Sequence, residues 1–356
     1  MPPVINVHTH FQPESVLPIV APYGIEMTPG EDGRSWYFRS GHVEYYLPGT
    51  GRDGISKFWG ASLGDQVAEM DAHGIDINIL QPSPMIFSYH LPAHVGATFS
   101  RAFNDEVARH IAEQPARFWG SAQLPMQDLD LAAAELTRAV KELGMKSCSL
   151  GYVLGENRTL ADPDCDEFLS AVEELDVPVL LHPVALGQDI DLKSGGAEWL
   201  MKYEVDWAWG YLFVETAAVI GFIFSGALDR HPRLRIMIPH GGGMLPYQVG
   251  RLENHMRVFA RGDSRLPRSA NEYLRAFYLD TVVHDPRGLK LPIDVMGEDN
   301  VVLGSNYPGW DNAPMWQIIR ELPSLSDSAK DKILGLNSAT RLFKASPDNS
   351  LAAHLR

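Results

Sequence analysis

Short runs rich in apolar and β-branched residues recur along the chain, and segments with helical periodicity separate most of them. Such alternation of strands and helices is typical of a parallel sheet in an α/β fold. Several of the runs are apolar on both faces, as strands buried under helices should be. Eight such units predict a (β/α)₈ barrel. The expected strands are Val4–His8, Ile77–Gln81, Phe118–Leu124, Ser147–Leu150, Val177–His182, Leu234–His240, Ala276–Val282 and Asn300–Ser305. The clearest helical periods lie at Leu131–Leu143 and Asp164–Leu175.

Two stretches depart from this alternation. Residues 22–63 are rich in Gly, Pro and aromatic residues, and they predict a small β lobe or lid inserted after the first strand. The segment 187–229 combines tryptophans with an apolar helix-like run, which favours a cover over the site or an oligomer interface. We therefore expect one domain over residues 1–345 that includes the lobe, followed by a peripheral tail over 346–356.

The composition limits the partners and the compartment. The 356 residues carry a formal net charge of −15 at pH 7. This charge argues against nucleic acid or an anionic membrane as a partner, because both need a positive protein surface. An anionic substrate is still compatible with it if a few arginines line the pocket. The chain opens without a charged-then-apolar leader, and Cys148 and Cys165 lack metal or redox spacing. We expect a cytoplasmic protein with reduced thiols rather than a disulfide.

Histidines stand at the C-terminal ends of several predicted strands. His8 and His10 are two residues apart, and side chains two apart on a strand point to the same face. His182 ends the fifth predicted strand and His240 ends the sixth. Because barrel enzymes carry their active sites at the C-terminal ends of the strands, these imidazoles are expected on one rim. Three or four of them could hold one metal ion, and imidazole suits zinc as well as iron, copper or nickel.

The three glycines after His240, Gly241 to Gly243, have a second interpretation as a phosphate-binding loop. They lack the spacing and the lysine of a P-loop. We therefore assign them to a tight turn between a strand and a helix, where glycine adopts conformations that other residues avoid.

Motifs along nearly the whole chain match one family. They are Asn6-Val7-His8-Thr9-His10-Phe11-Gln12-Pro13, Met85-Ile86-Phe87-Ser88-Tyr89, Gln123-Leu124-Pro125-Met126-Gln127, Leu181-His182-Pro183, His240-Gly241-Gly242-Gly243, Phe277-Tyr278-Leu279-Asp280, Val283-His284-Asp285-Pro286 and Gly304-Ser305-Asn306-Tyr307-Pro308. Together they resemble the amidohydrolase superfamily, in the branch typified by 2-amino-3-carboxymuconate-6-semialdehyde decarboxylase. By this resemblance His8, His10 and His182 would be metal ligands, with zinc the usual ion. His240 would be the catalytic acid/base beside the metal.

Asn306 departs from the family pattern, which has an aspartate as the remaining ligand and catalytic group. We still place Asn306 in the metal and catalytic site, although a neutral amide is a poorer ligand and cannot take a proton as a carboxylate does. Three explanations are open. The asparagine is an engineered inactivating replacement, or a natural variant with altered chemistry, or another acid such as Asp280 or Asp311 takes over.

The resemblance also implies residues that bind an anionic substrate. Arg251 matches an arginine that relatives donate across a homodimer interface, and either Arg52 or Lys57 is expected from the lobe. A guanidinium binds a carboxylate through two parallel hydrogen bonds, which lysine cannot do. Aromatic pocket residues are expected at Trp59, Phe87, Tyr89 and Trp310, and groups that support the metal ligands at His284 and Asp285.

The leading hypothesis is a metal-dependent, non-oxidative decarboxylase of a small hydroxylated aromatic or heteroaromatic acid, or of a related dienoate. Metal-bound water and His240 would be its proton-transfer groups. The alternative is a zinc-dependent hydrolase or hydratase acting on an aromatic ring-cleavage product, which Asn306 favours if it is native. A third reading is a catalytically inactive binding protein that keeps the fold.

Overall fold

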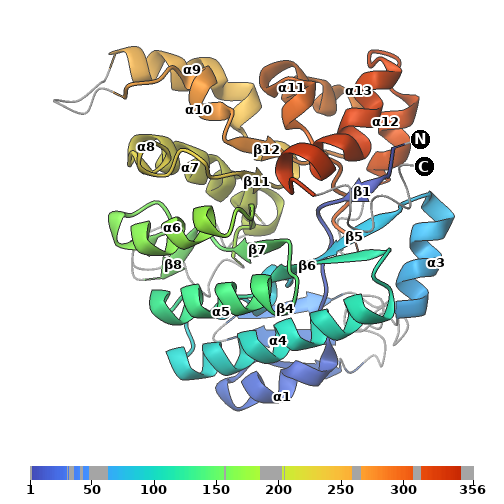
Figure 1. The fold of residues 1–356 in the computed structure, drawn as a ribbon, viewed down its shortest axis with the longest axis vertical. Helices are drawn as coiled ribbons and strands as arrows, with labels where there is room; N and C mark the ends of the chain where they lie inside the picture. Colours follow the sequence, from blue (N-terminus) through green and yellow to red (C-terminus); the bar gives the residue numbers. More distant parts are fainter. Residues whose placement is uncertain are drawn as a thin grey trace.

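A central sheet surrounded by helices makes up most of the computed structural model (Figure 1). The structure describes residues 2–29, 31, 36–40, 43–47, 63–155, 158–184, 203, 205–258, 266–307 and 314–345. Seven parallel strands form the sheet in the order β1-β5-β6-β7-β10-β11-β12. Their bounds are Ile5–Asn6 for β1, Ile77–Leu80 for β5, Phe118–Ala122 for β6, Ser147–Leu150 for β7, Val179–Leu181 for β10, Ile236–Ile238 for β11 and Phe277–Leu279 for β12.

The segment 301–307 closes the sheet into a barrel. On one side it forms a parallel bridge between Val301 and Leu279, where the Val302 amide donates to the Leu279 carbonyl at 2.9 Å. On the other side the Val7 amide donates to the Leu303 carbonyl at 2.8 Å, next to β1. The eighth predicted strand is thus present as an irregular extended segment that pairs with β12 on one side and β1 on the other. The (β/α)₈ barrel is confirmed.

The strand β7 has the predicted bounds, whereas the other six regular strands are shorter than predicted, and prolines account for part of the difference. Pro178 and Pro239 flank β10 and β11, and proline has no amide hydrogen to donate to a neighbouring strand. Pairing still continues past β10, since the His182 amide donates to the Leu150 carbonyl at 2.8 Å. The candidate site residues therefore begin where the regular strands end.

Helices follow the barrel strands as the alternation predicts. The predicted helix Leu131–Leu143 forms as α5, Leu129–Lys141, which begins where the Asp128 side chain accepts hydrogen bonds from two backbone amides. The predicted helix Asp164–Leu175 forms as α6, Asp166–Glu174. The other α-helices in the described part of the chain are α1 (Leu17–Val20), α3 (Leu63–His73), α4 (Ala93–Glu113), α7 (Tyr211–Phe224), α8 (Ala227–Arg230), α9 (Leu245–Val258), α10 (Ala270–Leu274), α11 (Pro286–Met296), α12 (Met315–Glu321) and α13 (Asp327–Asp331). π-helical turns lie at Asp206–Gly210, Lys332–Leu336 and Ser338–Leu342.

Two small sheets lie outside the barrel. An antiparallel sheet of β2 (Glu26–Pro29), β3 (Trp36–Ser40) and β4 (Val43–Leu47) falls within the predicted lobe, whose residues 48–62 lie outside the described part. A hairpin of β8 (Val153–Gly155) and β9 (Arg158–Thr159) follows β7. The lobe as a unit, the single domain over 1–345 and the tail over 346–356 remain predictions.

Side chains on the two faces of the barrel strands pack into two separate hydrophobic clusters. The larger cluster takes Val179, Leu181 and Ile236 and packs them against the helices. The smaller one takes Leu180 and Met237, which alternate with them along the same strands and so point to the other face. Leu342 and Phe343 from the last helical turn join this smaller cluster. The barrel interior is therefore a packed core, and ligands must bind at the strand ends.

Among the described helices, none combines the length and the apolar character that a bilayer-spanning helix requires.

Candidate active site

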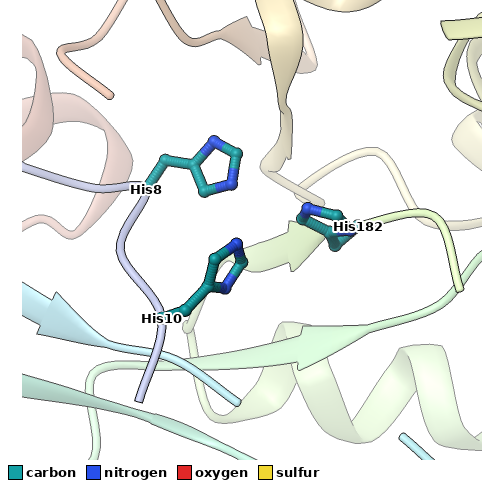
Figure 2. Close-up of side chains that lie close together, drawn as sticks. All are labelled: His8, His10 and His182. Carbon is teal, nitrogen blue, oxygen red and sulfur yellow. The ribbon is translucent and has the colours of Figure 1, made fainter. Parts of the chain in front are cut away.

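His8, His10 and His182 converge at the C-terminal ends of β1 and β10 (Figure 2). One ligand nitrogen from each ring lies within 4.8 Å of the others. His8 and His182 are buried, whereas His10 is partly exposed. Figure 2 shows the rings pointing toward a common centre from two segments that are far apart in sequence. The predicted ligands are thus brought together in a group that could hold one metal ion.

Hydrogen bonds select which nitrogen His8 and His182 present to the common centre. The Nδ1 atom of His8 lies 2.5 Å from Oδ2 of Asp280, and Nδ1 of His182 lies 2.8 Å from the Pro183 carbonyl oxygen. Because both partners are acceptors, Nδ1 carries the hydrogen in each ring and Nε2 keeps its lone pair. Metal-binding histidines commonly have a carboxylate or carbonyl partner of this kind, which fixes the ring and raises its basicity. The donor set fits a divalent transition metal such as zinc.

Neutral imidazoles are the form that binds a metal, and the surroundings favour that form. Burial lowers the pKa of His10 well below its ordinary value, and the adjacent His8 lowers it further. Burial also lowers the pKa of His182, with His10 and His8 acting in the same direction. A positive charge on one ring disfavours protonation of the next. These rings are therefore ready for metal binding at neutral pH.

Asp280 supports His8. Its second carboxylate oxygen accepts hydrogen bonds from the Gly241 amide at 2.9 Å and the Val282 amide at 3.0 Å. Burial is the largest single effect and raises the pKa of Asp280, but the hydrogen bond and charge of His8, the charge of His240 and the Gly241 amide together outweigh it, so the pKa is lowered. A β-carbon on Gly304 would lie 2.8 Å from Oδ2 of Asp280, so glycine is required there. With both oxygens committed, Asp280 is poorly placed to replace a carboxylate at position 306.

Asn306 lies directly beside the cluster. Its backbone amide donates to the His8 carbonyl at 2.9 Å, and its side chain is close enough to His10 to favour the protonated ring and so to oppose part of the lowering of the His10 pKa. The residue has a φ of 59°, a left-handed conformation that asparagine and aspartate tolerate better than most residues. The position thus suits a group that acts at the metal, although its role as a ligand stays a prediction. The alternative acid Asp311 lies outside the described residues.

His240 completes a group of four imidazoles. Its ring centroid lies 5.2 Å from that of His8 and 5.4 Å from that of His182. The residue follows β11 and opens the 3₁₀ turn His240–Gly242. Gly241 to Gly243 all have positive φ, and a β-carbon on Gly243 would lie 2.3 Å from the Leu212 carbonyl oxygen. The glycines therefore form the tight turn predicted from the sequence, and this turn aims His240 at the cluster.

Glu215 is the site residue that the sequence did not reveal. Its carboxylate Oε1 lies 2.6 Å from Nδ1 of His240, and its side chain is completely buried. Burial raises the pKa of Glu215 to about 7. Glu215 is the one charged residue in the apolar sequence of α7, and a lone carboxylate in such a helix was the available signal. Near neutral pH the Glu215–His240 pair can hold or release a proton.

The remaining predicted residues have mixed placements. Phe87 and Tyr89 lie in the core with stacked rings 5.7 Å apart, and the Tyr89 hydroxyl accepts a hydrogen bond from the Gly151 amide. Arg251 is exposed on α9. Their roles in substrate binding stay predictions. The expectation that Asp285 supports a metal ligand is wrong, because its carboxylate instead accepts a hydrogen bond from the Arg287 amide at the start of α11. Arg52, Lys57, Trp59 and Trp310 lie outside the described residues.

Comparisons with known proteins place these features in a family. The amidohydrolase family model matches residues 5–344. The 2-amino-3-carboxymuconate-6-semialdehyde decarboxylase of Dictyostelium discoideum is 28% identical over 340 residues, covering 94% of this chain and 90% of the relative. The gamma-resorcylate decarboxylase of Polaromonas sp. is 34% identical over 293 residues, covering 78% and 86%.

Solved structures agree with this relationship. A 2,6-dihydroxybenzoate decarboxylase in complex with 2,6-dihydroxybenzoate superposes with a TM-score of 0.76 at 25% identity, covering 97% of this chain and all of the other. A dihydroxybenzoic acid decarboxylase from Polaromonas sp., solved with manganese and 2-nitroresorcinol, superposes with the same TM-score at 27% identity, covering 97% of each chain. From the full-length family match, the shared barrel and the relatives of more than 30% identity, the chain belongs to the amidohydrolase family.

Proposed function

We propose that this protein is a metal-dependent, non-oxidative decarboxylase of a small hydroxylated aromatic or heteroaromatic carboxylic acid, or of a related dienoate. The observation that carries the proposal is the convergence of three histidines that could hold a metal ion with a fourth imidazole, His240, that is held by a carboxylate. Similar proteins that cover most of the chain are decarboxylases of such acids.

The proposed reaction replaces carbon dioxide with a proton on one ring carbon. A metal ion held by His8, His10 and His182 would bind substrate oxygens and stabilise their negative charge. His240, protonated on both ring nitrogens at the start, donates the proton on Nε2 to the ring carbon that bears the carboxylate. The bond to the carboxylate carbon then breaks, its electron pair returns to the ring, and carbon dioxide leaves. Glu215 accepts the hydrogen on Nδ1 of His240 throughout and holds the ring in place.

Zinc is the metal that we propose for this chain, because three imidazoles match its preferred ligands. A solved dihydroxybenzoic acid decarboxylase contains manganese instead, so both metals belong in the test.

A hydrolase or hydratase is the second candidate. A 2-keto-4-carboxy-3-hexenedioate hydratase from Sphingobium sp. is 27% identical over 253 residues, which cover 69% of each chain. Asn306 is the feature of this chain that favours such a change of chemistry. The decarboxylase proposal has more support, because decarboxylases supply the relatives of higher identity.

Carbon dioxide release tests the function. We expect the protein, loaded with zinc or with manganese, to release carbon dioxide in proportion to substrate loss from a panel of hydroxylated benzoates, picolinates and aminocarboxymuconate-type acids. A chelator should reduce the rate to background, and added metal should restore it. Substrate loss without carbon dioxide would favour the hydrolase or hydratase. Bound metal without loss of any substrate would favour a binding protein.

We also propose a homodimer and a cytoplasmic location. Trp209, Phe213, Ile220 and Phe224 are exposed at helical spacing along α7 and the turn before it. A helix with an apolar outer face, packed on a barrel by its inner face, is typical of a helix that is covered in an assembly. Cys148 and Cys165 are free and buried, which supports a reducing compartment.

Arg251 offers a direct test of the dimer. We expect Arg251→Ala to raise KM by about 10-fold to 100-fold, because a charge-assisted hydrogen bond to the substrate carboxylate is lost. If the arginine acts across the interface, mixing Arg251→Ala with His240→Asn should restore about one quarter of wild-type activity when the substrate concentration is below the wild-type KM, where both variants alone are nearly inactive, since each mixed dimer keeps one complete site. Arg257→Ala, on the same helix, is the control. Absence of restoration in proven mixed dimers would contradict the shared site.

A further inference from the structure

We infer that Glu215 is a positioning residue for His240, fixing the tautomer and the direction of the imidazole that faces the metal cluster. This inference rests on the proposed function, because it assigns a residue to the same proton-transfer site.

The contact between the two side chains is short and protected from water. Oε1 of Glu215 lies 2.6 Å from Nδ1 of His240, Glu215 is fully buried and the His240 side chain is 9% exposed. A hydrogen shared along this line occupies Nδ1 whether it sits nearer the carboxylate or nearer the ring. Proton exchange with a substrate would consequently run through Nε2, the ring nitrogen that does not face the carboxylate. The carboxylate thus decides which nitrogen does the chemistry.

The backbone at His240 needs such a support. Its φ is 47°, a left-handed conformation that is unfavourable for a residue with a β-carbon and persists only where surrounding contacts enforce it. The α7 helix supplies several of these contacts. Tyr211, one helical turn before Glu215, stacks on the His240 ring with the planes 20° apart, and the Thr216 hydroxyl accepts a hydrogen bond from the Met244 amide. One helix therefore holds both the ring and the turn that carries it.

The environment of the second carboxylate oxygen of Glu215 favours a functional role for this residue over a purely structural one. Oε2 is buried and has no hydrogen-bond partner among the described residues. A carboxylate in that state lowers the stability of the fold, since burial removes water without supplying a replacement. If this position served only the stability of the fold, an uncharged side chain would stabilise the protein more than a carboxylate does. Retention of the carboxylate at such a cost is expected at a functional site.

Glu215→Gln is the decisive variant, because it keeps the size and removes the charge. A glutamine can turn its NH₂ group toward Nδ1 and stabilise the wrong tautomer, which in an acid–base pair of this kind lowers kcat by about 10²-fold to 10⁴-fold. We expect that loss with KM and bound metal close to wild type, and with a melting temperature equal to or above wild type. Glu135→Gln is the matched control. It removes a buried carboxylate that pairs with Arg138 and Asn104, so its stability should fall while kcat is kept.

A second measurement needs no substrate. In zinc-loaded protein with ¹⁵N-labelled histidine, the imidazole signals of His240, assigned by their loss in His240→Asn, should show hydrogen on Nδ1 in wild type and a changed tautomer in Glu215→Gln. Wild-type kcat in Glu215→Gln, or an unchanged tautomer, would overturn the inference. A wild-type protein that releases no carbon dioxide but shows the tautomer change would overturn the decarboxylase proposal while supporting Glu215 as the residue that positions His240.

Discussion

Replacing His240 with asparagine is expected to lower kcat by about 10²-fold to 10⁴-fold, the range that general acid–base groups contribute. The ring lies 5.2 Å from His8 and 5.4 Å from His182, measured between centroids, and its Nδ1 is occupied by Glu215. Only Nε2 can act, and asparagine offers no group that exchanges a proton near neutral pH. Steady-state carbon dioxide release should show the loss.

Metal content distinguishes catalysis from metal binding in this variant. His8, His10 and His182 form the cluster without His240, so His240→Asn should keep one equivalent of metal by elemental analysis. His231→Asn is the matched control, because His231 is also buried but pairs with Asp166 away from the site. That variant should lose stability and keep kcat. Loss of metal from His240→Asn would instead make His240 a ligand.

Changing Asn306 to aspartate is expected to raise carbon dioxide release by about 10²-fold or more, if the asparagine is an inactivating replacement. A carboxylate would add an anionic ligand beside His8 and His10, and it would accept a proton that the amide cannot. The substitution should preserve the backbone conformation, because the hydrogen bond from the backbone amide of residue 306 to the His8 carbonyl does not involve the side chain. Aspartate also tolerates a φ of 59°. Initial rates with zinc and with manganese measure the effect.

The outcome also decides among the explanations of Asn306. Asn254→Asp, which adds the same charge on the exposed side of α9, controls for net charge and should leave the rate unchanged. A large gain in Asn306→Asp alone would identify the asparagine as inactivating. An active wild-type protein that gains nothing from the aspartate would show that the asparagine belongs to its native chemistry. Wild-type and variant proteins that consume substrate without carbon dioxide would favour the hydrolase or hydratase.

Local periodicity was enough to predict much of this molecule. Strand–helix alternation predicts the barrel, and the two-residue spacing of His8 and His10 predicts one face because side chains alternate along a strand. His182 was predicted at the same rim because it ends a parallel strand. In each case the geometry depends on a few consecutive residues and on a rule that every barrel obeys. The predictions therefore needed no knowledge of which distant residues meet.

Only the tertiary structure decided which groups support these histidines. Asp280 reaches His8 across 272 residues of sequence, and Glu215 reaches His240 from a helix whose apolar sequence predicts burial and nothing more. The tertiary structure likewise places Phe87 and Tyr89 in the core, and their role in substrate binding stays a prediction. Such pairings depend on how the closed barrel sets the helices against the strand ends. Burial then strengthens the effect of Asp280 and Glu215 on their histidine partners, because electrostatic interactions are stronger where water is excluded.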